Sequence, residues 1–558
     1  MAELILGPLL RYVDETAASL WVETARAAVV RVIAGAHVAE ASTFAVHGHH
    51  YALVCLDDLE PGTRTAYRVE VDGTAVWPEV GSDLPDPVIA TLQPGKQLRI
   101  AFGSCRTSVG HDARGNRTHG IDALRAYALR MAGLTDASRD DDPDPGGSAR
   151  WPDLLLLLGD QVYADETTEE MQRFIESRRD TDEPPGTELA DYQEYAELYR
   201  LAWSDPVNRW LFSTVPSAMI FDDHDIRDDW NTSQSWKEEM EATEWWHERI
   251  VSGLASYWVY QHLGNLSPAA RAEDEIWQRI TTGQRDVTEI LEAFADRVDQ
   301  QPKTYRWSYV RDFDTQARLI VVDSRNARDL DPEHRSLLHE DEMAWFDEHL
   351  VGGFDHLLIG SSLPFLLGAG LHHVEAFGEA MAERAWGTRL ATVGERIRRG
   401  VDLEHWAAFQ AAFRRTCDMV SEVARGERGP APRTVVFLGG DVHHSYLSEA
   451  RPRHGTPFRS HVVQAVCSPI RNPLPYAMRF VTAVSAYGFA GPIGRLAARS
   501  AKVPDPPWHW RFLGRPWFDN NLATLEVVPE GLHLWWAKGA VEDDPDRPAL
   551  VTVHDATV

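Results

Sequence analysis

The sequence predicts an α/β protein in which a small β-sandwich precedes a larger layered domain of strands that alternate with helices. Three observations lead to this fold class. Residues 4–88 form short alternating segments with turn residues between them, whereas the rest of the chain carries apolar strand-like runs separated by helix-like segments. The composition, with 44% hydrophobic and 25% charged residues in a chain of 558, is that of a folded globular protein and argues against disorder.

The first domain is predicted from segments such as SLWVET, VVRVIAG and AYRVEVDG, which alternate apolar and polar positions. Residues 56–73, LDDLEPGTRTAYRVEVDG, resemble the E-to-F corner of fibronectin type III domains, in which Tyr67 would support the corner of the sandwich. This resemblance implies packing and carries no chemistry. We therefore predict a fibronectin III-like β-sandwich over residues 1–92 and a second domain over residues 93–558.

Six apolar runs predict the strands of the second domain: LRIAFGSC, LLLLLGD, AMIFDDHD, ARLIVVDSR, HLLIGSS and TVVFLGGD. Their near-continuous apolar character is typical of strands that are buried on both faces. Residues 192–203, 235–262 and 403–423 have the spacing of amphipathic helices. The stretch 235–299 is predicted to be a helical insertion between strands.

Charge and cysteine content exclude several classes of protein. The formal net charge of −30 repels polyanions, so general nucleic-acid binding is not expected. The four cysteines are far apart and form neither a disulfide framework nor a zinc-finger pattern, which suits a reducing compartment. No apolar stretch approaches the roughly 20 residues of a membrane span. The N-terminus lacks the features of a signal peptide, so we expect a cytoplasmic location.

Chemically rich side chains follow four of the predicted strands, at the place where open α/β sheets bind their ligands. The four segments are FGSCR (102–106), GDQVY (159–163), FDDHD (221–225) and GGDVHH (439–444). Together they offer a thiolate, a phenolate, imidazoles and several carboxylates, a set that would repel itself without cations. This set predicts a dinuclear site with a trivalent or borderline transition metal beside an oxygen-loving divalent ion. Zinc alone is more usually bound by histidine and cysteine.

The segments FGSCR, GDQVYAD, FDDHDIRDDWN and LGGDVHHS, in this order, resemble the signature segments of the alkaline phosphatase D (PhoD-like) family of calcineurin-like metallophosphoesterases. The resemblance spans nearly the whole chain. It implies that the second domain is a layered αββα metallophosphoesterase domain with helical insertions. Two metal ions are implied as cofactors.

The resemblance implies a ligand set for each ion. The iron(III)-type site would have four ligands: Cys105, Asp160, Tyr163 and His443. The calcium-type site would have three: Asp160, Asp223 and Asp441. Asp160 would bridge the two ions, with zinc or manganese as alternative occupants.

The resemblance also assigns catalytic roles. His224 would stabilise the phosphoryl oxygens or protonate the leaving group, and Asp160 would take part as the bridging carboxylate. We expect Asp222 or Asp225, which lie in the same FDDHD segment as His224, to orient the His224 ring.

Arginines near the motifs have two interpretations. Arg106 and Arg227 are candidates for a bidentate clamp on the phosphate of the substrate, and ion pairs with neighbouring aspartates are the equal alternative. For Asp323, Arg325 and Arg328, in VVDSRNAR, we expect structural ion pairs.

The sequence therefore predicts metal-dependent hydrolysis of small phosphomonoesters, phosphodiesters or both, by a water activated between two metals. A second enzymatic alternative is a metal-dependent amide or lactone hydrolase, although such enzymes usually have more histidine ligands. The non-enzymatic alternative is a metal-binding interaction protein whose site has lost its activity.

Overall fold

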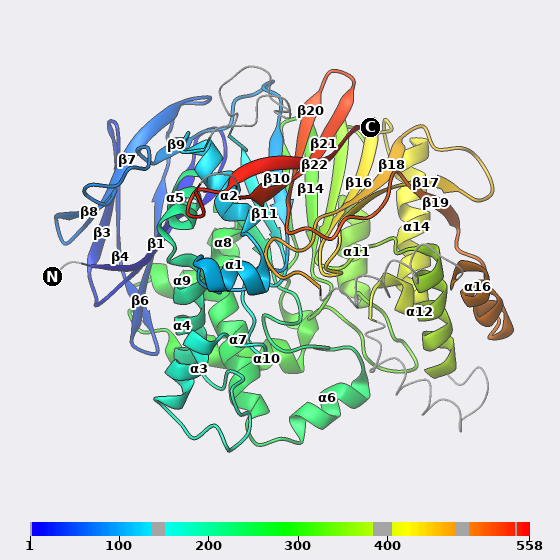
Figure 1. The fold of residues 1–558 in the computed structure, drawn as a ribbon, viewed down its shortest axis with the longest axis horizontal. Coiled ribbons are helices and arrows are strands. Elements are labelled where there is room, and N and C mark those ends of the chain that lie inside the picture. Colours follow the sequence, from blue (N-terminus) through cyan, green and yellow to red (C-terminus); the bar gives the residue numbers. More distant parts are fainter. Residues whose placement is uncertain (1–2, 136–150, 383–403, 475–489, 542–543) are drawn as a thin grey trace.

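The computed structural model describes residues 3–135, 151–382, 404–474, 490–541 and 544–558. An N-terminal part with two antiparallel sheets is followed by a part with two mixed sheets and many helices, which confirms the predicted fold class (Figure 1). Among the described residues, no helix combines the length and the apolar composition that a bilayer crossing requires.

The N-terminal part is a pair of facing sheets with a shared apolar core. The first sheet has the order β1-β2-β6-β5, and the second has the order β4-β3-β7-β8 with β9 paired to β7. The strands are β1 Leu4–Val13, β2 Ala18–Thr24, β3 Val29–Ala34, β4 His37–Ser42, β5 Phe44–Val46, β6 His49–Leu56, β7 Arg64–Val71, β8 Thr74–Trp77 and β9 Val88–Ala90. Leu20, Val32, Val54 and Val69 are fully buried between the sheets.

Tyr67 of β7 is buried in the core of the sandwich and also contacts the second part of the chain. Its hydroxyl donates a hydrogen bond of 2.6 Å to the backbone oxygen of Ser213, which lies in helix α5 (Pro206–Thr214). The side chain therefore ties the sandwich to the second part of the chain.

The second part contains one sheet of six strands and one of seven. Their orders are β12-β11-β10-β20-β21-β22 and β13-β14-β15-β16-β18-β17-β19. The strands are β10 Arg99–Gly103, β11 Leu154–Leu158, β12 Ser217–Ile220, β13 Tyr309–Phe313, β14 Ala317–Val322, β15 His356–Ser361, β16 Thr434–Gly439, β17 Tyr446–Pro452, β18 His461–Val466, β19 Trp508–Phe512, β20 Leu522–Val528, β21 Gly531–Ala540 and β22 Ala549–Thr557. The six predicted runs are β10, β11, β12, β14, β15 and β16, and within each sheet these three neighbours run parallel.

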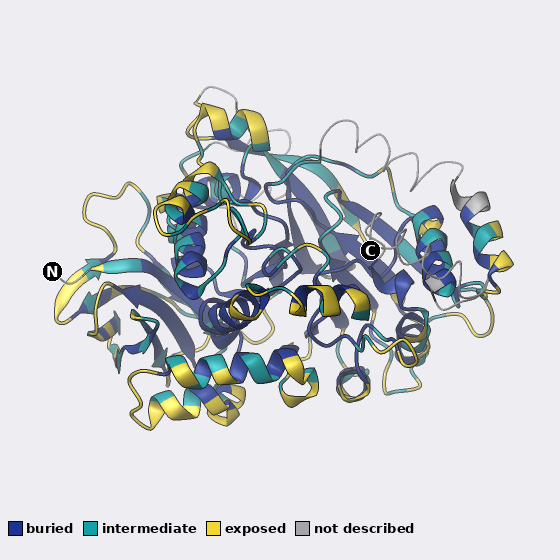
Figure 2. Ribbon diagram, turned by 90° about the horizontal axis from the view of Figure 1, so that it is seen from below, coloured by how far each residue is buried: buried dark blue, intermediate teal, exposed yellow. Residues whose placement is uncertain are grey.

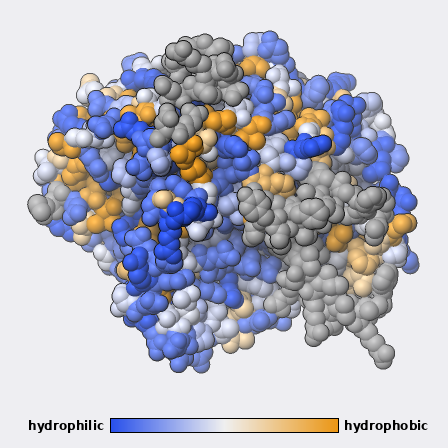
Figure 3. Space-filling model, viewed as in Figure 1, coloured by the Kyte–Doolittle hydropathy of each residue, from blue (hydrophilic) through white to orange (hydrophobic). Residues whose placement is uncertain are grey.

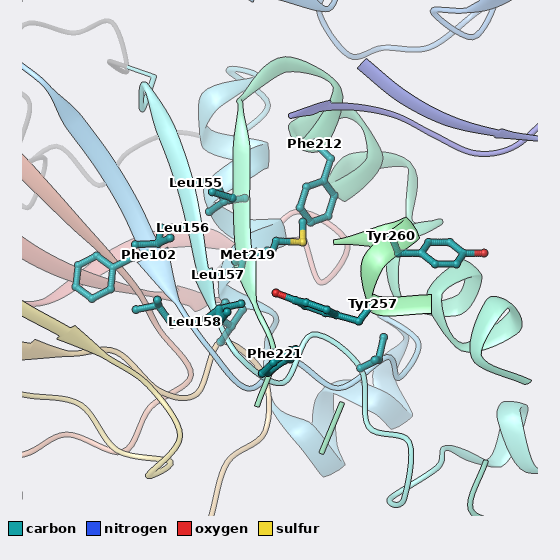
Figure 4. Packing of buried hydrophobic residues seen from close by; sticks show 14 of the residues in the cluster. Phe102, Leu155, Leu156, Leu157, Leu158, Phe212, Met219, Phe221, Tyr257 and Tyr260 are labelled. Atoms are coloured by element: carbon teal, nitrogen blue, oxygen red, sulfur yellow. The ribbon is translucent and has the colours of Figure 1, made fainter. Parts of the chain in front are cut away.

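The two mixed sheets pack face to face around a common core. A side chain added at Gly360 of β15 would lie 3.3 Å from the side chain of Leu158 in β11, so the inner faces are in close contact. All five leucines of β11 are buried. Figure 4 labels four of them, Leu155 to Leu158, with Phe102 on one side and Met219, Tyr257 and Tyr260 on the other. Figure 2 shows buried strands at the centre and exposed residues along the outer helices.

Helices cover the sheets and fill the predicted insertion. They are α1 Ala113–His119, α2 Ala123–Met131, α3 Glu169–Glu176, α4 Tyr192–Trp203, α5 Pro206–Thr214, α6 Gln234–Glu241, α7 Trp246–Tyr260, α8 Pro268–Glu273, α9 Glu275–Thr281, α10 Thr288–Gln300, α11 Glu340–His349, α12 Ala369–Ala382, α14 Gln410–Arg425 and α16 Ala490–Ser500, with short 3₁₀ turns at His262–Gly264, Pro302–Thr304 and Trp406–Ala408. The face of the molecule in Figure 3 is largely hydrophilic, with apolar residues interspersed.

The helix predictions agree with the structure to different degrees. Helix α4 has the predicted bounds, and the side chain of Asp191 caps its N-terminus. The stretch 235–262 is divided by a turn at residues 242–245 into α6 and α7, and the hydroxyl of Thr243 in this turn donates to the backbone oxygen of Met240. The stretch 403–423 begins outside the described residues, and its regular helix is α14.

Candidate metal centre

The four predicted motifs meet at one edge of the mixed sheets. Cys105 follows β10, Asp160 follows β11, and Asp223 follows β12. These strands are parallel neighbours, so their carboxyl ends lie side by side. Asp441 follows β16 of the facing sheet, and its backbone N–H donates to the hydroxyl of Ser104 at 3.0 Å. The strand ends of both sheets therefore contribute to one site.

Tight turns aim the side chains of this site. Four of the predicted ligands have left-handed backbone, with φ between 50° and 63°: Cys105, Asp160, Asp441 and His443. The first two turns are joined by hydrogen bonds, from the N–H of Cys105 to the oxygen of Gly159 at 3.3 Å and from the N–H of Arg106 to the oxygen of Asp160 at 2.9 Å. Such backbone is unusual for residues other than glycine and is concentrated at functional sites.

A first donor group combines sulfur, nitrogen and oxygen. Ligand atoms of Cys105, Asp160 and His443 all lie within 4.8 Å of one another. The sulfur of Cys105 is 3.3 Å from Oδ2 of Asp160, and the hydroxyl of Tyr163 is 3.4 Å from the same oxygen. The four residues predicted for the iron-type site are thus brought together.

A second donor group consists of carboxylates. Ligand oxygens of four residues lie within 4.8 Å of one another: Asp160, Asp222, Asp223 and Asp441. This group contains the three residues predicted for the calcium-type site and adds Asp222. Asp160 belongs to both groups, as expected for a bridging residue.

The buried atoms and charges of both groups fit a pair of cations. Oδ1 of Asp160 and Oδ2 of Asp222 are buried and have no hydrogen-bond partner among the described residues. Burial, helped by the Cys105 thiol, raises the pKa of Asp160 well above its ordinary value. Burial also raises the pKa of Asp222 to about 6 and that of Cys105 to about 12. Bound cations would offset this desolvation and let the groups ionise.

His224 lies beside the metal centre and is oriented by Asp165. Its Nδ1 is 2.9 Å from Oδ1 of Asp165, and its ring centre is 4.8 Å from that of Tyr163. Burial opposes a charge on the His224 ring, but the carboxylates of Asp165 and Asp223 outweigh burial and raise its pKa well above the ordinary value. Asp165 occupies Nδ1, and the other ring nitrogen, Nε2, lies 4.0 Å from Oδ1 of Asp228.

The expectation that Asp222 or Asp225 orients His224 is wrong. Asp222 belongs to the carboxylate group, and its other partner is the guanidinium of Arg325. Asp225 accepts the backbone N–H groups of Asp160 and Asp222, each at 2.9 Å, because its carboxylate lies between the two turns. Asp225 therefore fastens the second motif to the third.

His405 is a further residue of the site, and it was not found from the sequence. Its Nε2 is 2.8 Å from Oδ2 of Asp441, and its Nδ1 is 2.7 Å from Oε1 of Glu375 in α12. Burial would raise the pKa of Asp441, but the hydrogen bond and charge of His405 outweigh it and lower the pKa to about 2. No strand-end motif marks His405, because it comes from an irregular segment that only tertiary packing brings to the site.

The arginines are mostly structural. Nε and Nη2 of Arg106 donate to Asp122 at 3.0 and 2.8 Å, and Nη1 donates to the backbone oxygen of Ala202. This buried guanidinium is fully engaged in the core, which corrects the prediction of a phosphate clamp at Arg106. Arg227 bonds to Glu188 and is partly exposed, so its role in substrate binding stays a prediction.

The two arginines of VVDSRNAR form the expected ion pairs, whereas Asp323 accepts the backbone N–H groups of Arg325 and Asn326 at 2.8 and 2.9 Å. Arg325 pairs with Asp222, Asp223 and Glu404, and Arg328 pairs with the same Glu404. Both arginines are buried, so they hold the third motif against the core.

Comparisons with known proteins agree with this architecture. The family model described as PhoD-like phosphatase matches residues 147–488, and that of a domain of unknown function, DUF7800, matches residues 1–89. A solved structure titled as the structure of PhoD aligns with a TM-score of 0.59 at 14% identity, over 99% of this chain and 89% of that one.

A purple acid phosphatase, PPD1 from yellow lupin (Lupinus luteus) seeds, aligns with a TM-score of 0.49 at 10% identity, over 95% of this chain and 71% of that one. The search of curated proteins finds no match. At 14% identity, the likeness to PhoD establishes a shared fold and does not by itself assign the role of any residue.

Proposed function

The chain belongs to the PhoD-like phosphatase family, whose model matches more than half of its residues, and on this basis we propose that it hydrolyses small phosphate esters at the candidate metal centre. The observation that carries the proposal is the sharing of Asp160 between two donor groups, one with sulfur and nitrogen and one of carboxylates. Two adjacent cation sites suit displacement at phosphorus, where both the attacking and the leaving oxygen carry charge.

The two donor groups would select different cations. Cys105, Tyr163 and His443 complete the first group with Asp160, and this mixture favours an iron(III)-type ion. Asp223 and Asp441 complete the second with oxygen ligands, which favour a calcium-type ion. When bound, the two cations would supply positive charge to the phosphoryl oxygens and lower the pKa of the attacking water.

The side chains of this protein would then handle the proton. His224, held by Asp165 at 2.9 Å, donates its proton to the ester oxygen as the bond to phosphorus breaks. Water supplies the new oxygen on phosphorus, so the products are an alcohol and phosphate, or a phosphomonoester where the substrate is a diester. His405 and Glu375 keep Asp441 in place during this step.

An activity assay with metal analysis tests the proposed function. We expect purified protein to contain two metal ions per chain and to hydrolyse p-nitrophenyl phosphate, bis(p-nitrophenyl) phosphate or both. Chelation should abolish the activity and added cations should restore it. Turnover of an aryl lactone without turnover of either phosphoester would instead favour the lactone hydrolase alternative.

A cytoplasmic location stays a prediction.

Tyr163→Phe tests the proposed iron ligation. A ferric ion bound by a thiolate and a phenolate should give the protein a visible charge-transfer band that reduction or chelation bleaches. The variant keeps the buried ring and removes only the oxygen, so we expect the band to shift or disappear while the fold is retained. An absorption spectrum of the iron-loaded variant measures this effect.

A matched control is Tyr199→Phe, another buried tyrosine, whose hydroxyl bonds to Gln261 outside both donor groups. This variant should leave the band unchanged. An active, iron-loaded Tyr163→Phe protein with the wild-type spectrum would exclude the phenolate ligand.

A further inference from the structure

A second polar cavity lies beside helices α12 and α16, which pack next to each other at the right of Figure 1. Its volume is about 380 Å³. The polar and aromatic residues of its wall are His373 of α12, Arg495 and Arg499 of α16, Arg453 just after β17, and His509 and Trp510 of β19. None of these residues belongs to either donor group of the metal centre.

The cavity is positively charged although the chain is strongly acidic. Three arginines line it, and the neighbouring carboxylate of Asp505 pairs with two of them, with Arg495 at 2.7 Å and with Arg499 at 2.9 Å. Nε of Arg453 donates to the backbone oxygen of Pro506 at 2.9 Å. Within the described part of the chain, Nη1 and Nη2 of Arg453 have no partner. The three arginines and Asp505 together have a formal net charge of +2.

The guanidinium groups of the three arginines lie around the same cavity and near His373. Burial lowers the pKa of His373, and the positive charges of Arg495, Arg453 and Arg499 lower it further, against the opposing charge of Asp505. His373 and the three arginines thus line one cavity. Guanidinium groups that converge without enough carboxylates are the usual means of binding phosphate oxygens, which they can contact in pairs.

We propose that this cavity binds a small phosphorylated organic molecule, with its phosphate on the three arginines and its organic part against Trp510. The volume of about 380 Å³ lies within the range of small-molecule sites and exceeds the space that a bare phosphate ion needs. The half-buried indole of Trp510 supplies the apolar wall that an organic group can contact.

This site is separate from the metal centre, so the proposal goes beyond the proposed hydrolysis. His373 and Glu375 lie two positions apart on α12 and thus face different directions. His373 lines the cavity, whereas Glu375 holds His405 of the metal centre. The helix stands between the two sites, and a ligand of the cavity would not occupy the place of the substrate.

Calorimetry on the full-length chain tests the proposal. The Asp160→Asn background prevents turnover from contributing heat, and inorganic phosphate and AMP serve as probes of a free and of an organic phosphate. We expect AMP to bind at one site and more tightly than inorganic phosphate. The double variant Arg453→Gln/Arg499→Gln should weaken AMP binding by about tenfold or more, because two of the three charges are lost.

Arg451→Gln is the matched control. Arg451 lies two positions before Arg453, its side chain is 70% exposed, and its partner is Glu449 at 3.0 Å outside the cavity. This variant should bind AMP as the background protein does. In the wild-type background, hydrolysis by all arginine variants should match that of the unmodified protein, because these arginines are outside the metal centre.

Each outcome decides the proposal. Equal AMP affinity in the double variant and in Arg451→Gln, or no binding of either probe, would overturn it. Binding of inorganic phosphate as tight as that of AMP, and lost in the double variant, would overturn the organic ligand and identify free phosphate as the occupant. If the double variant does not fold, Arg499→Gln alone carries the test, since that side chain is 56% exposed.

Discussion

Replacing Asp160 by asparagine is expected to lower phosphoester hydrolysis by at least about 10³-fold and to release cations from both sites. The reason is that Asp160 is the one carboxylate common to both donor groups. Asparagine is chosen because it tolerates the left-handed backbone of this position, with φ of 50°, better than alanine does. Metal analysis after dialysis and steady-state kinetics measure the two effects.

The same variant should make the metal-free protein more stable. Burial raises the pKa of Asp160 well above its ordinary value, so above the pKa of the unfolded chain this group favours the unfolded state. A neutral side chain removes that penalty, and the melting temperature with chelator present should rise. Retention of both ions with near wild-type activity would exclude Asp160 as the bridge.

Asp122→Asn is a control with the opposite effect on stability. Asp122 is also buried, but it forms an ion pair with Arg106 at 2.8 Å away from both donor groups. Removing this charge leaves the Arg106 guanidinium without its partner and should cost about 3 to 5 kcal/mol of folding free energy. Metal content should stay at the wild-type level in the molecules that remain folded.

His224→Asn is expected to lower kcat by about two to four orders of magnitude while both cations stay bound. His224 is not part of either donor group that contains Asp160, and Asp165 holds it in place. If it protonates the leaving group, the loss should be larger for an alkyl phosphate than for p-nitrophenyl phosphate, whose leaving group needs no proton.

The partner of His224 supplies the control. Asp165 acts through His224, so adding Asp165→Asn to His224→Asn should cause little further loss. A clear additional loss would mean that Asp165 has a role of its own. Loss of a cation from the His224→Asn protein would make this histidine a ligand, in the group that it forms with Asp223 and Asp228.

The parts of the site that follow strands could be predicted from sequence because two local signals coincide there. An apolar run such as LLLLL fixes the strand, and the polar residues directly after it must lie at the sheet edge. The strand-end positions of Cys105, Asp160 and Asp441 are sufficient to predict that these three residues lie together. The same signals predict the layered fold of the second part, because each of the four motifs directly follows one strand, β10, β11, β12 or β16 in this order.

The remaining parts depend on contacts between distant segments. Asp165 reaches His224, and Glu375 reaches His405, through packing that no short motif records. Arg106 follows Cys105 directly, yet its partner Asp122 lies at the start of α2 and draws the guanidinium into the core. The strands β13 and β17 to β22 are not among the six predicted runs, because they carry neither a long apolar run nor a chemical motif.

The left-handed turns at the metal centre have a consequence for engineering a more thermostable variant of this protein. Each such turn costs an ordinary L-residue roughly 1–2 kcal/mol, and a glycine at Cys105 would relieve that cost while deleting the thiol. Selection for thermal stability alone would therefore favour substitutions that remove the metal ligands. Improved melting temperature and retained turnover need to be selected together, with residues 105, 160, 441 and 443 held constant.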